Sequence, residues 1–187
     1  MVDGKRLAKT LRKSNNLIIE KADEKNYHVT DTYMLVKLTR EEYRDFFVSY
    51  NSYKSTANIP FDFEEAIGLM RGGEFEDKSI KTARIIDQVK EAQYFVNITE
   101  FYKKLDNQEV KVFKAGNELG IFNRQYEFLI NLGDEYKSKG KKSPLFILNK
   151  GEVRAVIMPV MDRSDITIKN RFKELLTADI KSQEKIA

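Results

Sequence analysis

The sequence predicts an α+β fold in which a small unit, a helix with an antiparallel meander, occurs twice. The later copy reads as a short strand and a two-turn helix at 94–105, followed by three strands. These strands are expected at 109–113, 120–123 and 125–132. The earlier copy is fainter, with an amphipathic helix at 5–13 and strands at 16–20 and 27–38. The repeated order indicates a domain built by internal duplication.

The composition is that of an ordinary globular protein. Its 187 residues are 41% hydrophobic and 33% charged, which is enough to form one core or two small ones. No run of about 18 apolar residues could span a bilayer, and the N-terminal residues lack the apolar segment of a secretory signal. We therefore expect a cytoplasmic protein without membrane partners. The absence of cysteine excludes disulfides and thiolate metal sites.

The predicted helix at 5–13 carries its charge unevenly. No acidic residue occurs from 4 to 19, and five cations surround a narrow apolar stripe of Leu7, Ala8 and Leu11. The cations are Lys5, Arg6, Lys9, Arg12 and Lys13. The net charge of +4 and the pI near 9.0 are compatible with an anionic partner. Two interpretations stay open, a solvated helix face and a helix that follows the phosphates of a nucleic acid.

The predicted strand at 27–38 is partly apolar on both faces, which is typical of a strand inside a covered sheet. It contains His28, the only histidine of the chain. No second histidine and no cysteine could complete a metal site. We therefore interpret His28 as an ordinary strand residue rather than a zinc ligand or a catalytic base.

The range 39–92 interrupts the repeated unit and predicts an inserted helical segment. Thr39 and Glu42 fit a capping box for a helix that continues through Phe47. Two further helices are expected at 61–70 and 78–92, with loops between them. The glycine pair at 72–73 lacks the Gly-Lys-Ser/Thr ending of a phosphate-binding loop, so we interpret it as a helix stop.

The last part of the chain predicts a hairpin and a terminal helix. Strands at 145–148 and 153–158 flank a Lys-Gly turn, and Pro159 ends the second strand. A mobile basic loop precedes the hairpin at 137–142. The predicted parts of the chain are a first half-domain (1–38), the inserted segment (39–92), a second half with the hairpin (93–162), and a C-terminal helix at 166–180 with its tail (163–187).

One strand motif resembles a known family, the bacterial DNA polymerase III beta subunits or sliding clamps, including phage-borne versions. Clamps often carry the pattern Thr-Asp-x-His-Arg-Leu in the first half of their domain. Thr30, Asp31 and Leu35 match this pattern, whereas Tyr33 and Met34 stand in place of the His-Arg pair. The resemblance implies a clamp-like domain of two similar halves.

Two other stretches extend the resemblance to about two thirds of the chain. Residues 95–105 are similar to the strand and short helix that open the second half of a clamp domain, and Met158-Pro159 resembles a motif at the end of the last strand. In a second alignment, 120–126 resembles the Phe-Asn-x-x-Tyr that opens a helix, which would make 125–132 helical. The alternation of apolar residues at 125–132 favours the strand. The range 39–92 has no counterpart in the family.

The resemblance also implies two sets of site residues. Clamp helices place Lys and Arg against DNA phosphates without reading bases. The matching residues here are Lys5, Arg6, Lys9, Arg12, Lys13, Lys103 and Lys104. The family's partner groove accepts a short apolar peptide. Its matching residues are Thr30, Tyr33, Leu35, Met158 and Pro159, which are equally compatible with an ordinary core.

These observations predict a non-catalytic DNA-replication accessory protein that binds duplex DNA without sequence preference and tethers replication proteins. The alternative is a clamp-like phage or mobile-element protein that binds or inhibits host replication factors without encircling DNA. A clamp ring contains six domains and this chain supplies about one, so a homo-oligomer is one expected form. No cofactor is implied. An enzyme is disfavoured because the sequence shows no paired catalytic carboxylates, nucleophile elbow or metal cluster.

Overall fold

The structure, a computed structural model, describes residues 1–161 except 54–56, 70–72, 79–81 and 106–107. The fold is α+β, and within these residues eleven strands form an antiparallel sheet. The helices are α1 (Gly4–Leu11), α2 (Arg40–Asn51) and α3 (Ala83–Asp87), with 3₁₀ helices η1 (Gln88–Glu91) and η2 (Arg124–Leu132). The predicted helix at 166–180 lies outside the described residues.

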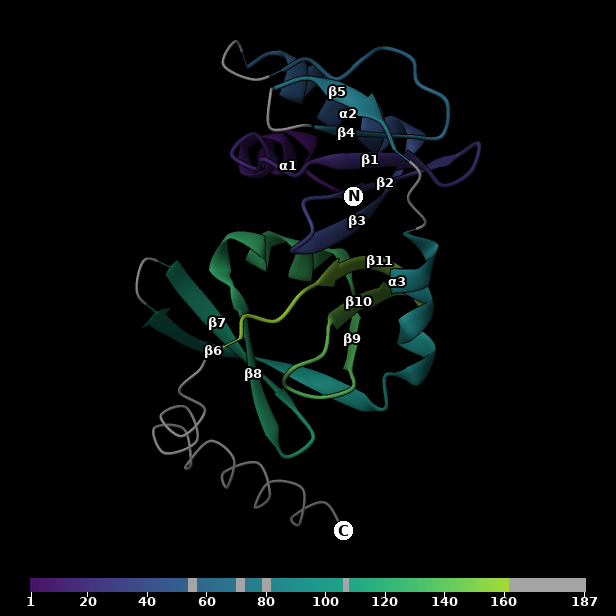
Figure 1. Cartoon of the computed structure of the whole chain (residues 1–187). Coiled ribbons are helices and arrows are strands. Elements are labelled where there is room, and N and C mark those ends of the chain that lie inside the picture. The colour runs from purple at the N-terminus through teal and green to yellow at the C-terminus, as the bar shows by residue number, and fades with distance from the viewer. Residues whose placement is uncertain (54–56, 70–72, 79–81, 106–107, 162–187) are drawn as a thin grey trace.

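The eleven strands are β1 (Ile18–Lys21), β2 (Asn26–Thr30), β3 (Met34–Thr39), β4 (Ala66–Leu69), β5 (Phe75–Asp77), β6 (Tyr94–Leu105), β7 (Gln108–Ala115), β8 (Glu118–Asn123), β9 (Glu135–Ser138), β10 (Leu145–Asn149) and β11 (Glu152–Ile157). Their order across the sheet is β5-β4-β1-β2-β3-β11-β10-β9-β6-β7-β8. Figure 1 shows two halves, one built from α1, α2 and β1 to β5 and the other from α3 and β6 to β11.

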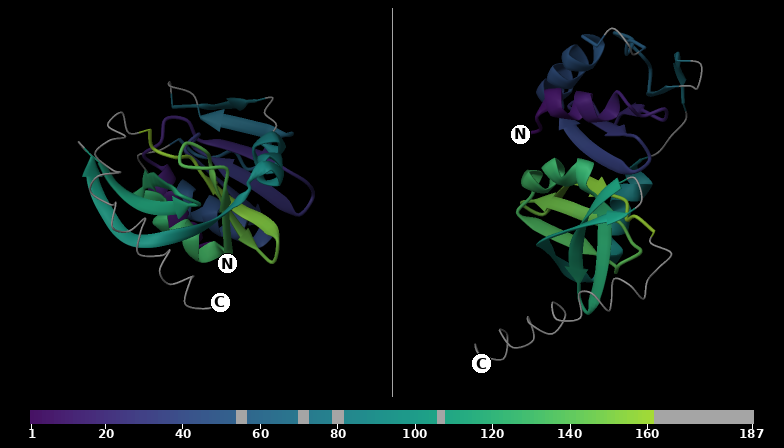
Figure 2. Two further views of the ribbon diagram at one scale, coloured as in Figure 1. Left: turned by 90° about the horizontal axis from the view of Figure 1, so that it is seen from below. Right: turned by 90° about the vertical axis from the view of Figure 1, so that its left-hand side faces the viewer.

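The two halves are joined by the pairing of β3 with β11, so one sheet runs through the molecule. The register aligns Met34 with Ile157, Leu35 with Val156, and Val36 with Ala155. The second half curls round on itself, as the two views in Figure 2 show. Beyond β11 the chain returns to β8, where the backbone N–H of Val160 donates to the carbonyl oxygen of Ile121 at 2.9 Å.

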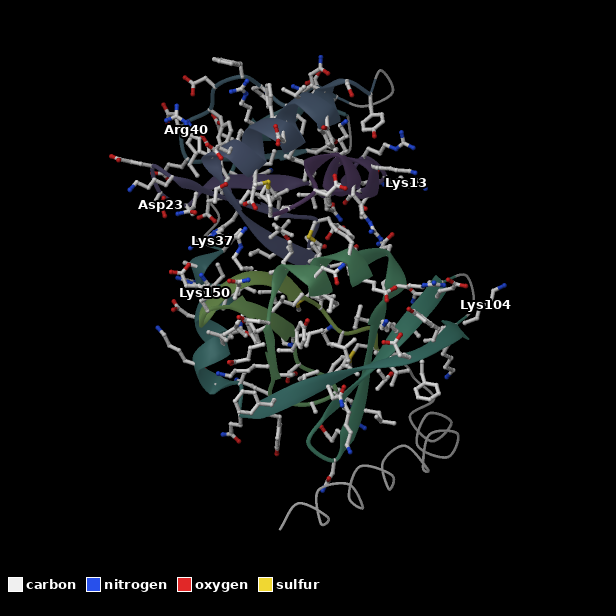
Figure 3. All side chains as sticks on the ribbon, turned by 180° about the vertical axis from the view of Figure 1, so that it is seen from behind. Lys13, Asp23, Lys37, Arg40, Lys104 and Lys150 are labelled. Atoms are coloured by element: carbon white, nitrogen blue, oxygen red, sulfur yellow. The ribbon has the colours of Figure 1, made fainter. Side chains whose placement is uncertain are left out.

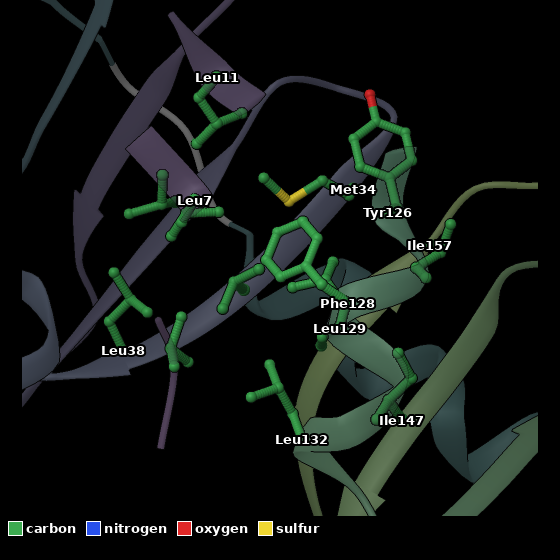
Figure 4. Close-up of a cluster of buried hydrophobic side chains, with 14 of the residues drawn as sticks. Leu7, Leu11, Met34, Leu38, Tyr126, Phe128, Leu129, Leu132, Ile147 and Ile157 are labelled. Carbon is green, nitrogen blue, oxygen red and sulfur yellow. The ribbon is translucent and has the colours of Figure 1, made fainter. Parts of the chain in front are cut away.

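A hydrophobic core lies where the two halves meet, on the face of the sheet that carries α1, α2 and η2 (Figure 4). Leu7 and Leu11 from α1 pack with Met34 and Leu38 of β3. The contribution of the other half comes from η2 and the hairpin, through Phe128, Leu129, Leu132, Ile147 and Ile157. The opposite face of β3, β11 and β10 is covered by α3 and η1. The shared core binds the halves into one folded unit.

Local signals in the sequence predicted three elements. The helix expected at 5–13 is α1, and its apolar stripe is buried. In α2, Thr39 and Glu42 form the expected capping box, although the helix continues past Phe47 to Asn51. The hairpin of β10 and β11 turns at Lys150 and Gly151, whose positive φ values of 51° and 81° suit a tight two-residue turn.

The prediction of one strand at 27–38 was wrong, because β2 and β3 form a hairpin there. The turn is made by Asp31, whose Oδ1 accepts from the backbone N–H of Tyr33 and of Met34, each at 3.0 Å. Thr30 Oγ1 donates to the Met34 carbonyl oxygen at 2.5 Å, and Thr32 has a φ of 75°. Short polar side chains that bond to nearby backbone favour such a turn over continued strand.

The two-turn helix expected within 94–105 is absent, and that whole range is the strand β6. It pairs with β9 at its start and with β7 along most of its length, with an irregularity between Ile98 and Tyr102. Lys103 and Lys104 are therefore strand residues. Pairing with two neighbours satisfies backbone groups that a short, lysine-rich helix would leave in solvent.

The strand expected at 125–132 is the 3₁₀ helix η2, as in the second alignment. The side chain of Asn123 accepts from the backbone N–H of Gln125 at 3.0 Å and begins the helix. Tyr126, Leu129 and Leu132 are buried at a spacing of three residues, which is the period of a 3₁₀ helix. Phe128 and Ile130 are apolar as well, so residues 126, 128, 130 and 132 also match the two-residue period of a strand.

The range 39–92 contains strands as well as helices. In place of the helix expected at 61–70, β4 lies between β1 and β5 in the sheet. Among the described residues of the helix expected at 78–92, α3 and η1 are helical. Within the expected loop at 137–142, Lys137 and Ser138 belong to β9. No helix in the described part of the chain is both long and apolar enough to cross a membrane.

Candidate nucleic-acid interface

Helix α1 presents a cationic face because its other face is buried. The helix begins at Asp3, whose Oδ1 accepts from the backbone N–H of Arg6 at 3.0 Å. Leu7, Ala8 and Leu11 are fully buried against the core. The cationic residues Lys5, Arg6, Lys9 and Lys13 are exposed, and Arg12 is half-buried. The helix thus separates apolar and cationic residues as its sequence predicts.

The lysines in and just after α1 differ in their contacts from the arginines of the same segment. The guanidinium of Arg6 lies 5.0 Å from the ring centre of Phe128, and that of Arg12 lies 4.5 Å from the ring centre of Tyr53. These cation–π contacts hold both charges in place while leaving them positive. Lys5, Lys9 and Lys13 form no ion pair within the described part of the chain. Their charges are available to an anionic ligand.

The other two predicted DNA-binding residues lie in the second half. Lys104 is exposed near the end of β6 and pairs in register with Glu109, while Lys103 is half-buried. Figure 3 shows Lys13 and Lys104 on the same side of the molecule, one from each half, and Arg40 on the other side. The structure therefore brings Lys104 to the side of α1 even though it is not helical.

A cleft of about 610 Å³ lies between α1, β6, β7 and η2. Its charged lining consists of Arg6 and Lys111 with Glu100 and Glu127, and amides of Asn97 and Asn131 contribute further polar groups. Two cations thus face two carboxylates. This balance gives the cleft no preference for an anion.

A polar cluster that was not predicted holds one side of this cleft together. Lys111 is buried, and its Nζ donates to Glu127 Oε1 at 2.5 Å and to the Tyr102 hydroxyl at 3.0 Å. The Tyr102 hydroxyl donates to the same carboxylate oxygen at 2.8 Å. The guanidinium of Arg124 lies 4.2 Å from the Tyr102 ring centre and donates to Glu109 at 2.6 Å. These contacts link β6, β7 and η2.

The protonation of this cluster favours a structural role. Burial alone would lower the pKa of Lys111, but its hydrogen bonds to Glu127 and Tyr102 outweigh burial and raise it. Burial would likewise raise the pKa of Glu127, but the bonds from Lys111 and Tyr102 lower it. Lysine and carboxylate therefore remain charged, so Lys111 acts as a donor and not as a base.

The predicted partner-groove residues separate into an exposed and a buried group. Tyr33 and Met158 are 64% and 37% exposed, and the Met158 N–H donates to the Tyr33 carbonyl oxygen at 2.8 Å. Pro159, half-buried, follows directly. Leu35 is buried on the opposite face of the sheet with α3, and Thr30 is buried in its turn. The structure thus brings Tyr33, Met158 and Pro159 together at the surface, without Leu35.

His28 is buried in β2 and joins the two halves. Its Nδ1 lies 2.6 Å from Thr82 Oγ1 and 3.6 Å from Glu20 Oε2, and Thr82 also donates to Glu20. Burial lowers the pKa of His28, against the opposing charge of Glu20. The described residues contain no cluster of His, Asp and Glu that could hold a metal ion. His28 therefore anchors the residue that precedes α3.

A groove on α2 was also missed. Its lining is Tyr27, Arg40, Glu41, Tyr43, Arg44, Phe47 and Phe61. The pairs Arg40 with Arg44 and Tyr43 with Phe47 are each four residues apart in a predicted helix, which was a usable signal. Tyr27 and Phe61 come from other elements, so their approach could not be read from local spacing.

Together these features define a small α+β protein with one continuous antiparallel sheet, an exposed cationic helix and an aromatic groove. No family model, curated protein or solved structure matches this chain.

Proposed function

We propose that this protein is a non-catalytic DNA-binding accessory protein that holds duplex DNA through the cationic face of α1. The observation that supports the proposal is the row Lys5, Lys9 and Lys13, which is exposed and has no ion-pair partner among the described residues. A folded protein usually intersperses acidic groups among surface cations. Here Lys5, Lys9 and Lys13 have no acidic group among them, which suits a polyanionic ligand.

The spacing of this row fits contact with phosphates rather than with bases. Lys5 and Lys9 are four residues apart in α1 and so differ in rise by about 6 Å, and Lys13 follows the helix, so the three lysines can reach different phosphates of one duplex. Lysine is a flexible point charge and reads no sequence when it binds phosphate. Lys104 on the same side of the molecule extends the surface to the second half (Figure 3). We therefore expect binding without sequence preference.

Replacing Lys5, Lys9 and Lys13 together by glutamine is expected to weaken duplex binding for all sequences alike. Loss of three phosphate contacts should reduce the slope of log K against log salt by about 2.7, at about 0.9 for each contact. Fluorescence anisotropy with two duplexes of unrelated sequence, at several salt concentrations, measures both effects.

The matched control replaces three exposed lysines elsewhere, Lys25, Lys142 and Lys150, by glutamine and so has the same net charge. The control should keep most of the slope. An equal loss of slope in both variants would show that total charge, and not the face of α1, drives binding.

A second candidate function is a clamp-like interaction protein that binds replication proteins, with or without DNA. The observation in its favour is the pairing of β3 with β11, which places Tyr33 beside Met158 at the surface. The turn that follows Thr30-Asp31 and the segment Met158-Pro159, whose sequences resemble clamp motifs, are therefore neighbours. An exposed aromatic beside a methionine suits an apolar peptide anchor, because methionine adapts its shape.

For this candidate, Tyr33→Ala with Met158→Ala should abolish binding of a short apolar peptide of the kind that clamps accept, and leave duplex affinity unchanged. Both side chains are exposed, so the double variant should stay folded. Anisotropy of a labelled peptide measures binding, and Val48→Ala, an exposed apolar position on α2, is the control. Peptide binding that survives in the folded double variant would remove the Tyr33 and Met158 surface from consideration.

A further inference from the structure

The groove on α2 combines stacked aromatic rings with two arginines. Tyr27 from β2 stacks on Tyr43 from α2 with ring centres 3.8 Å apart and planes 8° apart. Phe47, one turn further along α2, meets the edge of Phe61 at 6.3 Å and 76°. The groove encloses about 430 Å³, which is within the range of small-ligand sites.

The arginines give the groove a positive charge. Arg40 and Arg44 are exposed, lie one helical turn apart on α2, and form no ion pair with any residue in the described ranges. Glu41 is the single carboxylate in its lining. Two guanidinium groups against one carboxylate leave a net positive charge at the rim. Guanidinium forks suit a phosphate, which can accept two parallel hydrogen bonds.

The position of Phe61 contributes little to the stability of the fold. It is 94% exposed, the most exposed phenylalanine of the chain's described part, and only its edge contact with Phe47 is formed. Burial of a phenylalanine stabilises a fold, and the exposed ring of Phe61 gains little of this stabilisation in the free protein. Its open ring face is suited to stack on a planar ligand.

We propose that this groove binds one unpaired nucleotide of a single-stranded nucleic acid. The base stacks on Phe61 beside Phe47, and the flanking phosphates contact Arg40 and Arg44. Alternating planar bases and phosphates match this arrangement of aromatic rings and guanidinium groups. An apolar peptide would leave both arginines without a partner, and paired bases in a duplex present no free face for stacking.

This site is separate from the cationic face of α1. Arg40 begins α2 on one side of the molecule, and Lys13 follows α1 on the other, as Figure 3 shows. The proposal therefore goes beyond duplex binding and does not depend on it. Loss of binding in a groove variant and loss of binding in the α1 variant are distinguishable because each uses its own ligand.

The test measures binding of an oligothymidine of ten nucleotides to the full chain. Phe61→Ala should weaken binding at least about fivefold, since stacking on an aromatic side chain contributes on the order of 1–3 kcal/mol for each base. Arg40→Gln with Arg44→Gln should weaken it and also reduce its salt dependence. Because the chain has nine tyrosines and no tryptophan, quenching of its tyrosine fluorescence on titration with the oligonucleotide measures binding.

Controls separate the possible sources of binding. Val48→Ala, an exposed apolar change on α2 outside the groove, should leave oligothymidine affinity unchanged, and circular dichroism checks that each variant is folded. Thymidine monophosphate should bind much more weakly than the oligonucleotide. The affinity for a duplex of the same length should be the same in the parent and in Phe61→Ala. Unchanged affinity in Phe61→Ala, equal affinity for the free nucleotide, or duplex binding that depends on Phe61 would each overturn the proposal.

Discussion

Replacing Glu42 with glutamine is expected to lower the free energy of unfolding by about 3–5 kcal/mol, the range for breaking a buried ion pair. The Glu42 side chain is 6% exposed and accepts from the backbone N–H of Val2 at 2.7 Å and of Thr39 at 2.9 Å. Arg154 of β11 donates to both of its oxygens, at 2.9 and 3.0 Å. The substitution removes the charge that pairs with Arg154 and one of the two acceptor oxygens, and so weakens the tie between α2 and β11.

The contribution of Glu42 should also depend on pH. Burial alone would raise its pKa, but the hydrogen bonds from Thr39 and Val2 and the charge of Arg154 outweigh burial and lower it. A carboxylate whose pKa is lower in the folded state stabilises the protein above its unfolded pKa, about 4.3. That contribution is lost as the pH falls through the folded pKa. Glu42→Gln should therefore flatten the acid side of the stability curve.

Urea unfolding at pH 7 and at several values below pH 5 measures both effects. Glu152→Gln is the matched control, since Glu152 lies on β11 and pairs with Lys37 at 3.7 Å but is largely exposed. Exposed pairs contribute about 0–1 kcal/mol, so this control should unfold nearly as the parent does. A Glu42 variant as stable as the control at pH 7 would show that Arg154 and the backbone donors find other partners.

Replacing Asp31 with alanine is expected to destabilise the fold by a similar amount, roughly 3–5 kcal/mol, because a buried, charged acceptor of three hydrogen bonds is lost. Asp31 is 4% exposed. One oxygen forms the turn between β2 and β3 with Tyr33 and Met34, and the other accepts from the Tyr126 hydroxyl of η2 at 2.7 Å. Its loss therefore weakens both the turn and the packing of η2.

Two further variants divide this effect. Tyr126→Phe removes only the bond to η2, so its cost should be about 1.5–3 kcal/mol, the value for a bond to a charged group. Asp23→Ala is the control, because Asp23 forms a similar turn with Lys25 and Asn26 but in solvent, and its loss should be smaller. Calorimetry or urea unfolding ranks the three variants. Equal stability of Asp31→Ala and Asp23→Ala would contradict a role for burial.

Elements defined by local chemistry were predictable from the sequence. The capping box of Thr39 and Glu42 and the Lys150-Gly151 turn depend on residues within a few positions of one another. The apolar stripe of α1 has a clear helical period. In each case the backbone bonds that define the element are also local, so tertiary context was not needed to recognise it.

The errors came where distant partners decide the structure. Residues 94–105 form a strand because β7 and β9 bind its backbone, which no local pattern shows. In η2 the apolar residues at 126, 128, 130 and 132 suit a strand. The N-cap at Asn123 and the packing of the buried η2 side chains in the core favour a 3₁₀ helix instead. The turn at Asp31 was overlooked although its Thr-Asp-Thr sequence carries a local signal.

The candidate sites divide in the same way. The cationic face of α1 follows from one helix, so its exposed lysines could be identified from the sequence. Tyr33 and Met158 were grouped by the family resemblance, and they lie just before β3 and just after β11, which pair, whereas Leu35 is buried on the other face of the sheet. The aromatic groove needs Tyr27, Tyr43 and Phe61 from three segments. Its assembly depends on the packing of α2 against the sheet.

The pairing of β3 with β11 has a consequence for synthesis on the ribosome. Leu35 pairs with Val156, so the second edge of β3 has no partner until nearly all described residues have been translated. A nascent chain that has folded α1, α2 and β1 to β3 would present an open strand edge, which is a template for pairing with another chain. Slow translation of the intervening residues would lengthen the interval in which two nascent chains can associate through β3.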